Sequence, residues 1–92
     1  MSNREKWSEY DLAESDLLTL ISYYSKIIDE EERGPTPDMD KIALWENEQH
    51  ALKMLKRGLS VENQVAIANI RAKYGPIAYA TLQKTRAAFQ KT

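Results

Sequence analysis

Residues 10–28, YDLAESDLLTLISYYSKII, decide the fold of this chain of 92 residues. Apolar side chains recur there at alternating steps of three and four, at Tyr10, Ala13, Leu17, Leu20, Tyr24 and Ile27. This spacing is the heptad rhythm of a helix that packs lengthwise against another helix. Leu18, Ile21 and Ile28 widen the stripe. We predict one long helix over residues 8–33, whose apolar stripe forms a core or a dimer seam.

Three further helices are expected, each bounded by residues that begin or end helices. Gly34-Pro35 ends the first helix, and Thr36 caps a second helix over residues 37–57 that stops at Gly58. Ser60 caps a third helix over residues 61–74, and Gly75-Pro76 gives a stop and restart before a fourth over residues 76–90. The predicted fold class is all-α. Residues 1–92 form a single domain, a compact bundle of about four helices with a long N-terminal helix.

Helical wheels predict which faces of these helices are buried. The second helix places its apolar residues on one face, namely Leu44, Trp45, Ala51, Leu52 and Leu55. Glu48 falls inside that arc, so its carboxylate must reach solvent at a packed edge, pair with a base or serve a function. The third helix is apolar most of the way round, which is typical of a helix in the middle of a bundle.

The charge of the chain divides by sign at His50. Residues 1–50 carry thirteen acidic and five basic residues, net −8, whereas residues 51–92 carry eight basic residues and one acid, net +7. Such asymmetry favours docking of one half on the other, antiparallel self-association, or an oriented encounter with a charged partner. The sequence leaves these alternatives open.

Composition excludes several kinds of chemistry. The chain has no cysteine, which removes disulfides, thiolate metal sites and cysteine nucleophiles. Its apolar runs are too short to span a bilayer and its N-terminus lacks a secretory signal, so we expect a cytoplasmic protein. Glu46 and His50 share a helical face but lack further ligands at metal-site spacing. With a single histidine and no phosphate-binding glycine loop, we expect no enzyme activity, cofactor or metal.

The expected function is therefore a non-catalytic protein-binding module, an adaptor, regulator or inhibitor of another macromolecule. Small proteins of this sort are often carried by phages and mobile elements. The predicted binding patch combines aromatic and acidic side chains of the first helix, namely Trp7, Tyr23, Asp29, Glu30, Glu31 and Glu32. Core packing of the aromatic rings and simple solvation of the acids are the alternatives. The four acids lie at a helix C-terminus, where negative charge opposes the dipole.

A nucleic-acid-binding regulator is the alternative function. The basic residues that could face phosphates or an acidic partner are Lys53, Lys56, Arg57, Arg71, Lys73, Lys84, Arg86 and Lys91. Two helices meeting at Gly75-Pro76 resemble a helix-turn-helix, but the turn is shorter and the second helix lacks an array of base-reading side chains. The same cations could instead neutralise the acidic half of the chain. The first helix is longer than its expected neighbours, so part of its stripe could bury against a second copy, and we also expect a homodimer.

Overall fold

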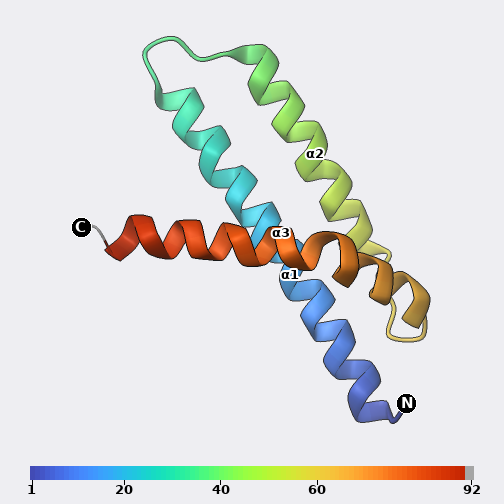
Figure 1. Ribbon diagram of the computed structural model, residues 1–92. Coiled ribbons are helices and arrows are strands. Elements are labelled where there is room, and N and C mark those ends of the chain that lie inside the picture. The colour runs from blue at the N-terminus through green and yellow to red at the C-terminus, as the bar shows by residue number, and fades with distance from the viewer. Residues whose placement is uncertain (91–92) are drawn as a thin grey trace.

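Three helices make up the whole secondary structure of the described residues. The computed structural model describes residues 1–90, and the side chains of residues 1–86. The helices are α1 (Asn3–Arg33), α2 (Met39–Arg57) and α3 (Gln64–Gln90) (Figure 1). The all-α class and the long N-terminal helix are confirmed. The predicted last residues of the first two helices, Arg33 and Arg57, are also confirmed. The predicted number of about four helices is wrong.

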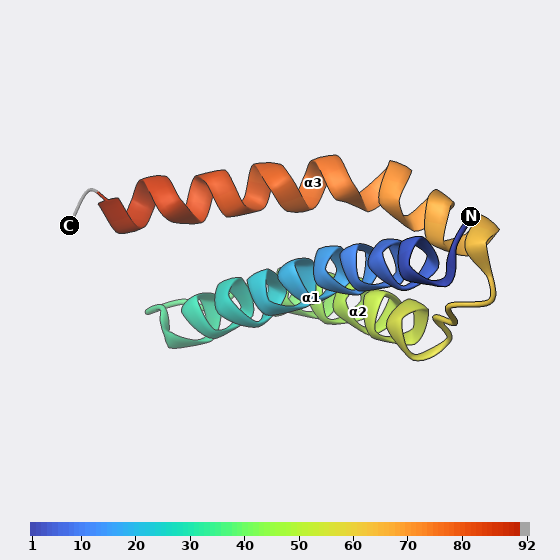
Figure 2. The ribbon, with the colours of Figure 1, turned by 90° about the horizontal axis from the view of Figure 1, so that it is seen from below.

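The helices are arranged around α1. The first two form an antiparallel hairpin, and α3 crosses it at a steep angle (Figure 1). In the second view α1 and α2 overlap in one layer, and α3 lies on one side of it (Figure 2). Backbone contacts join α1 to each of the other two helices, whereas α2 and α3 have none with each other. The expectation that the residues after Ser60 form the central helix is therefore wrong, and the central helix is α1.

The main difference from the predicted helices lies at Gly75-Pro76, where α3 continues without a break. Proline removes one backbone N–H from the helix ladder, but its fixed φ is compatible with helical backbone. Buried apolar residues on both sides of this pair keep the same phase, because Ile67, Ile70 and Ala78 all lie against α1. Packing of one continuous face on α1 therefore outweighs the local preference for a break.

Each helix begins at a cap other than the predicted one. Side-chain oxygens of Ser2, Asp38 and Asn63 accept hydrogen bonds from backbone N–H groups three residues later. The predicted caps of the second and third helices were Thr36 and Ser60, and the first helix was predicted to begin at residue 8. Short polar residues occur at several positions before each helix, so cap preference alone does not choose among them.

The core follows the stripe on α1. Ala13, Leu17 and Leu20 are buried, and they meet Leu52 of α2 and Ile67 of α3 in one apolar cluster. Leu17 and Ile67 are the largest fully buried side chains. The predicted stripe on the first helix is thus confirmed as a core, with Ile28 buried further along and Tyr10, Tyr24 and Ile27 half-buried.

The predicted buried face of the second helix is wrong in part. The residues that α2 turns to α1 are Ile42, Gln49 and Leu52, with Trp45 half-buried. Leu44, Ala51 and Leu55 are exposed instead. Because α2 packs on α1 alone, it buries one narrow face, and its second apolar stripe remains at the surface.

Gln49 is the one buried polar side chain of the described residues, and it fixes how α2 sits on α1. Its Nε2 donates to the backbone carbonyl of Ile21 at 2.8 Å and to Oγ of Ser25 at 2.7 Å. A buried amide that finds both partners only in one register disfavours sliding of the two helices.

Replacing Leu17 with alanine tests the core. We expect Leu17→Ala to lower the free energy of unfolding by about 2–5 kcal/mol, because the cavity would lie at the junction of all three helices. Leu12→Ala is the matched control: Leu12 is 42% exposed on the same helix, and its loss should cost less than about 1 kcal/mol. Denaturant unfolding measures both, and equal effects of the two substitutions would contradict this core.

Replacing Pro76 with alanine tests the continuity of α3. In a continuous helix, Pro76→Ala restores the bond to the carbonyl of Ala72 and raises the free energy of unfolding by about 1–3 kcal/mol. Pro37→Ala, in the loop between α1 and α2, should bring no gain because no helical bond is missing there. A loss of stability in Pro76→Ala would mean that Gly75-Pro76 holds a turn.

Candidate functional site

The predicted acidic and aromatic patch occupies different parts of α1. Trp7 lies near the N-terminus of the helix, 52% exposed, with its ring edge-on to Tyr10 at 5.5 Å. Asp29 lies 22 residues later, which corresponds to about 33 Å along a helix. The structure therefore does not bring Trp7 to the acids, and a partner that touched both would have to cover most of α1.

The acids at the end of α1 have partners of their own. Asp29 lies 3.2 Å from Arg33, and Glu30 lies 3.8 Å from Lys26. Glu31 reaches across the loop, and its carboxylate accepts a hydrogen bond from the backbone N–H of Asp38 at 3.1 Å. This contact joins the end of α1 to the cap of α2. Glu31, one of the four acids, therefore has a structural role in the hairpin. Binding of a partner by Asp29–Glu32 stays a prediction.

The predicted basic residues do not form one surface. Arg71 pairs with Asp16 of α1 at 2.6 Å, in the single ion pair that joins the acidic and basic parts of the chain among the described residues. Lys73 lies over the ring of Tyr74, 5.2 Å from its centroid. Arg86 is exposed near the end of α3, and Lys91 lies outside the described residues.

Gly75, which was predicted to end a helix, lies inside α3 beside that ion pair. A Cβ at Gly75 would lie 3.4 Å from Nη1 of Arg71 and 3.5 Å from Oδ2 of Asp16. Both distances are ordinary van der Waals contacts, so a Cβ fits at this position without displacing the pair.

Three of the remaining four basic residues gather at the end of α2, and the fourth, Lys84, lies on α3. Lys53, Lys56 and Arg57 line a shallow groove of about 410 Å³ together with His50 and Met54. No carboxylate lines this groove. The cluster of Lys53, Lys56 and Arg57 is the densest local group among the predicted basic residues that the structure describes.

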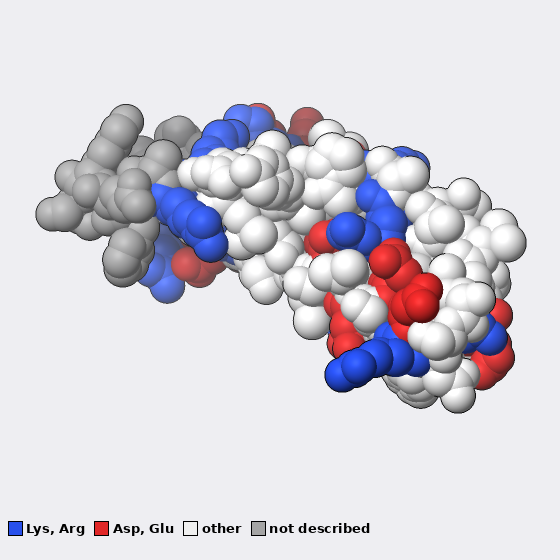
Figure 3. Space-filling view, turned by 60° about the horizontal axis from the view of Figure 1, so that its bottom comes forward, with Lys and Arg blue, Asp and Glu red and all other residues white. Residues whose placement is uncertain are grey.

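Charges of both signs are mixed elsewhere. On the face in Figure 3, basic and acidic side chains stand next to one another, and uncharged side chains cover much of the area between them. The split of charge along the sequence thus becomes an interspersed pattern on this surface.

Glu48 is exposed at the edge of the core, where its carboxylate accepts a hydrogen bond from the hydroxyl of Tyr24 at 2.5 Å. Burial, followed by this hydrogen bond, raises the pKa of Tyr24 to about 12. Both residues line a hollow of about 300 Å³ between α2 and α3, which Ala51 of α2 and Ile77 of α3 also line. Of the three roles considered for Glu48, the position at a packed edge is the one observed.

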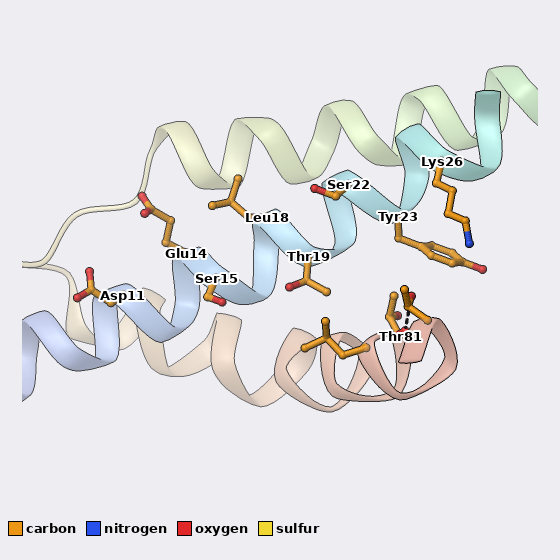
Figure 4. A pocket seen from close by; sticks show the side chains of 11 residues that line it. Asp11, Glu14, Ser15, Leu18, Thr19, Ser22, Tyr23, Lys26 and Thr81 are labelled. Atoms are coloured by element: carbon orange, nitrogen blue, oxygen red, sulfur yellow. Dashed lines mark hydrogen bonds between the residues drawn. The ribbon is translucent and has the colours of Figure 1, made fainter. Parts of the chain in front are cut away.

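A longer groove runs between α1 and the C-terminal half of α3, with a volume of about 470 Å³ (Figure 4). On the α1 side, Leu18 and Glu14 point away from α3, whereas Thr19 points toward it (Figure 4). Thr81 and Leu82 line it from α3. Tyr23 lies at one end, where Nζ of Lys84 is 6.0 Å from the centroid of its ring.

The sequence identified the apolar residues of α2 but predicted the wrong ones to be buried, and it gave no indication of this groove. The stripe has a visible signal, since Leu44, Ala51 and Leu55 recur at steps of seven and four, but the pattern does not say which of two stripes is buried. The groove depends on α3 passing unbroken over α1, which the predicted break at Gly75-Pro76 concealed.

Among the described residues, no group of three His, Asp or Glu side chains is placed to hold a metal ion. Glu46 and His50 therefore have no third ligand in this part of the chain. No helix in the same part of the chain is both long and apolar enough to cross a membrane. No protein-family model, curated protein or solved structure matches this chain.

The contact of Tyr24 with Glu48 predicts a pH dependence of stability. The pKa of Tyr24 is raised in the folded state from 10.0 to about 12, so the contribution is complete below pH 10 and is lost as the pH rises through about 12. Denaturant unfolding of the wild type and Tyr24→Phe should therefore give a stability difference that shrinks over this range. A difference that stays constant up to pH 12 would contradict the assigned contact.

Proposed function

We propose that this protein is a non-catalytic binding module that acts as an adaptor, regulator or inhibitor by covering a surface of another protein. The observation that carries the proposal is the exposed apolar stripe of α2. Leu44 is 56% exposed and Leu55 is 39% exposed, with the small Ala51 between them. These apolar side chains share one side of α2 with the polar Asn47 and Glu48, and exposed apolar side chains grouped on one side of a helix favour a protein-binding surface.

The shape of this surface suggests the kind of partner. The stripe leads into the hollow between α2 and α3, where Ile77 is 49% exposed beside Lys73 and Glu48. An apolar row with a mixed polar rim suits an amphipathic helix that lies along α2. Burying each large side chain in full would contribute about 1.5–3 kcal/mol, so a few such contacts suffice for specific binding.

The ionisable side chains are also consistent with a binding role. Their described contacts are helix caps, ion pairs, hydrogen bonds that hold the helices together and stacking of Lys on aromatic rings. Each of these contacts has a structural purpose. We therefore assign function to the surface and not to a reaction centre.

Charge introduced on the stripe tests the proposal. We expect the wild-type chain to recover one dominant protein from a lysate of its own organism, and Leu44→Glu with Leu55→Glu to lose it. Val65→Glu is the matched control, because Val65 is 73% exposed on a different helix, α3, and its replacement should leave recovery unchanged. Binding of the purified partner should weaken by about 100-fold in the stripe variant, corresponding to two anchor residues. Equal recovery by both variants would exclude α2 as the docking face.

Nucleic-acid binding is the second candidate, and the observation that favours it is the cluster of Lys53, Lys56 and Arg57. Three adjacent cations without a lining carboxylate can contact successive phosphates. A duplex mobility shift at low salt, lost in Lys53→Glu with Arg57→Glu and retained in Lys84→Glu with Arg86→Glu, would support this function. No shift of the wild type at low salt would exclude it.

A further inference from the structure

The residues of α1 that line the groove with α3 form a second stripe, on the side of the helix opposite the core. They begin at Asp11 and end at Lys26, with alternating steps of three and one. That spacing is the double row that one helix presents to another along a lengthwise contact. The stripe covers about 23 Å of helix, and Leu18 at its centre is 43% exposed.

The order of residues along this stripe reads as a set of complementary pairs about its midpoint, between Leu18 and Thr19. Asp11 and Lys26 stand at equal distances from the midpoint and carry opposite charge. Glu14 and Tyr23 come next, a carboxylate and a phenol. Ser15 and Ser22 form the third pair, in which both side chains are small, and Leu18 and Thr19 flank the midpoint. A two-fold axis through the midpoint would place the members of each pair opposite one another.

We propose that the groove binds a second copy of this chain, with the two α1 helices antiparallel and Asp11 of each copy facing Lys26 of its partner copy. A two-fold symmetric contact uses each pair twice, so two Asp11–Lys26 ion pairs close the ends of the interface. The phenol of Tyr23 is placed to donate to the carboxylate of Glu14 in the other copy. This proposal does not depend on the stripe of α2, which remains free for another protein.

Packing considerations agree with this register. Serines opposite serines allow the helix axes to approach closely, and Leu18 then enters the other copy's groove beside Leu82, which is 46% exposed. Lys84 lies over the ring of Tyr23, so a cation of α3 stands next to the acidic helix where the second copy would approach. A parallel arrangement would set Asp11 against Asp11 and Glu14 against Glu14, which like-charge repulsion disfavours.

Charge reversal followed by charge exchange tests the contact. Sedimentation equilibrium of the full chain should show a dimer, and Lys26→Asp should raise its dissociation constant by about tenfold or more, since two symmetric ion pairs become repulsive. Adding Asp11→Lys to the same chain should restore dimerisation, because the exchanged pair is again of opposite sign. Lys53→Asp, which makes the same change in net charge on α2, should have no effect. Lys26→Asp also removes the exposed pair with Glu30, so circular dichroism must show unchanged helix content.

Cysteine cross-linking tests the direction of the helices, and the chain has no cysteine of its own to interfere. A mixture of Ser15→Cys and Ser22→Cys chains should form a disulfide-linked dimer under mild oxidation, while either variant alone should not. Cross-linking by Ser15→Cys alone, a wild type that stays monomeric at the highest concentration reached, or failure of the exchanged charges to restore the dimer would each overturn the proposal.

Discussion

The structure depends on burial of one apolar stripe on α1 by two helices whose backbones do not contact each other. Leu17 and its neighbours meet Leu52 from one side and Ile67 from the other, so a single row of side chains holds the whole chain together. Each partner helix then has its own polar contact that fixes its position. Gln49 binds the backbone of α1 for α2, and Arg71 pairs with Asp16 for α3.

A central helix with one partner on each side leaves apolar surface uncovered. The outer row of α2, around Leu44 and Leu55, is exposed among the described residues, and α3 extends past α1 over the groove that contains Leu18 (Figures 1 and 4). A compact bundle of four helices would have buried such residues. The two surfaces differ in character, because the row on α2 is apolar with a mixed rim, whereas the stripe on α1 carries opposite charges at its two ends. These differences are the reason for assigning them different partners.

Local sequence signals predicted the helical class and the parts of the fold that depend on one helix at a time. The apolar stripe of residues 10–28 and the helix ends before Gly34 and Gly58 were of this kind. The path of the chain at Gly75-Pro76 was not predictable locally, since the pair favours a break and only packing of Ile70 and Ala78 on α1 shows that the helix continues. For the same reason the choice between the two stripes of α2 required knowledge of its neighbours.

For the candidate site, too, the sequence predicted local features but not those that depend on how the helices pack. Residue types predicted that Asp29–Glu32 and the cluster at Lys53 are charged surface groups. They did not predict which of the candidate residues lie together in space. Trp7 is separated from the acids by most of α1, and Arg71 is occupied by a structural ion pair. The complementary order of the groove residues can be recognised in the sequence only after the structure shows which side of α1 lines the groove with α3.

Native-state hydrogen exchange, read amide by amide, tests the central role of α1 most directly. Neither α2 nor α3 can stay packed after α1 unfolds, whereas α1 can keep one partner when the other opens. The slowest exchanging amides of the chain should therefore lie in α1 around Ala13 to Leu20, and their protection should match the free energy of global unfolding. Amides of α2 or α3 that outlast those of α1 would contradict this account.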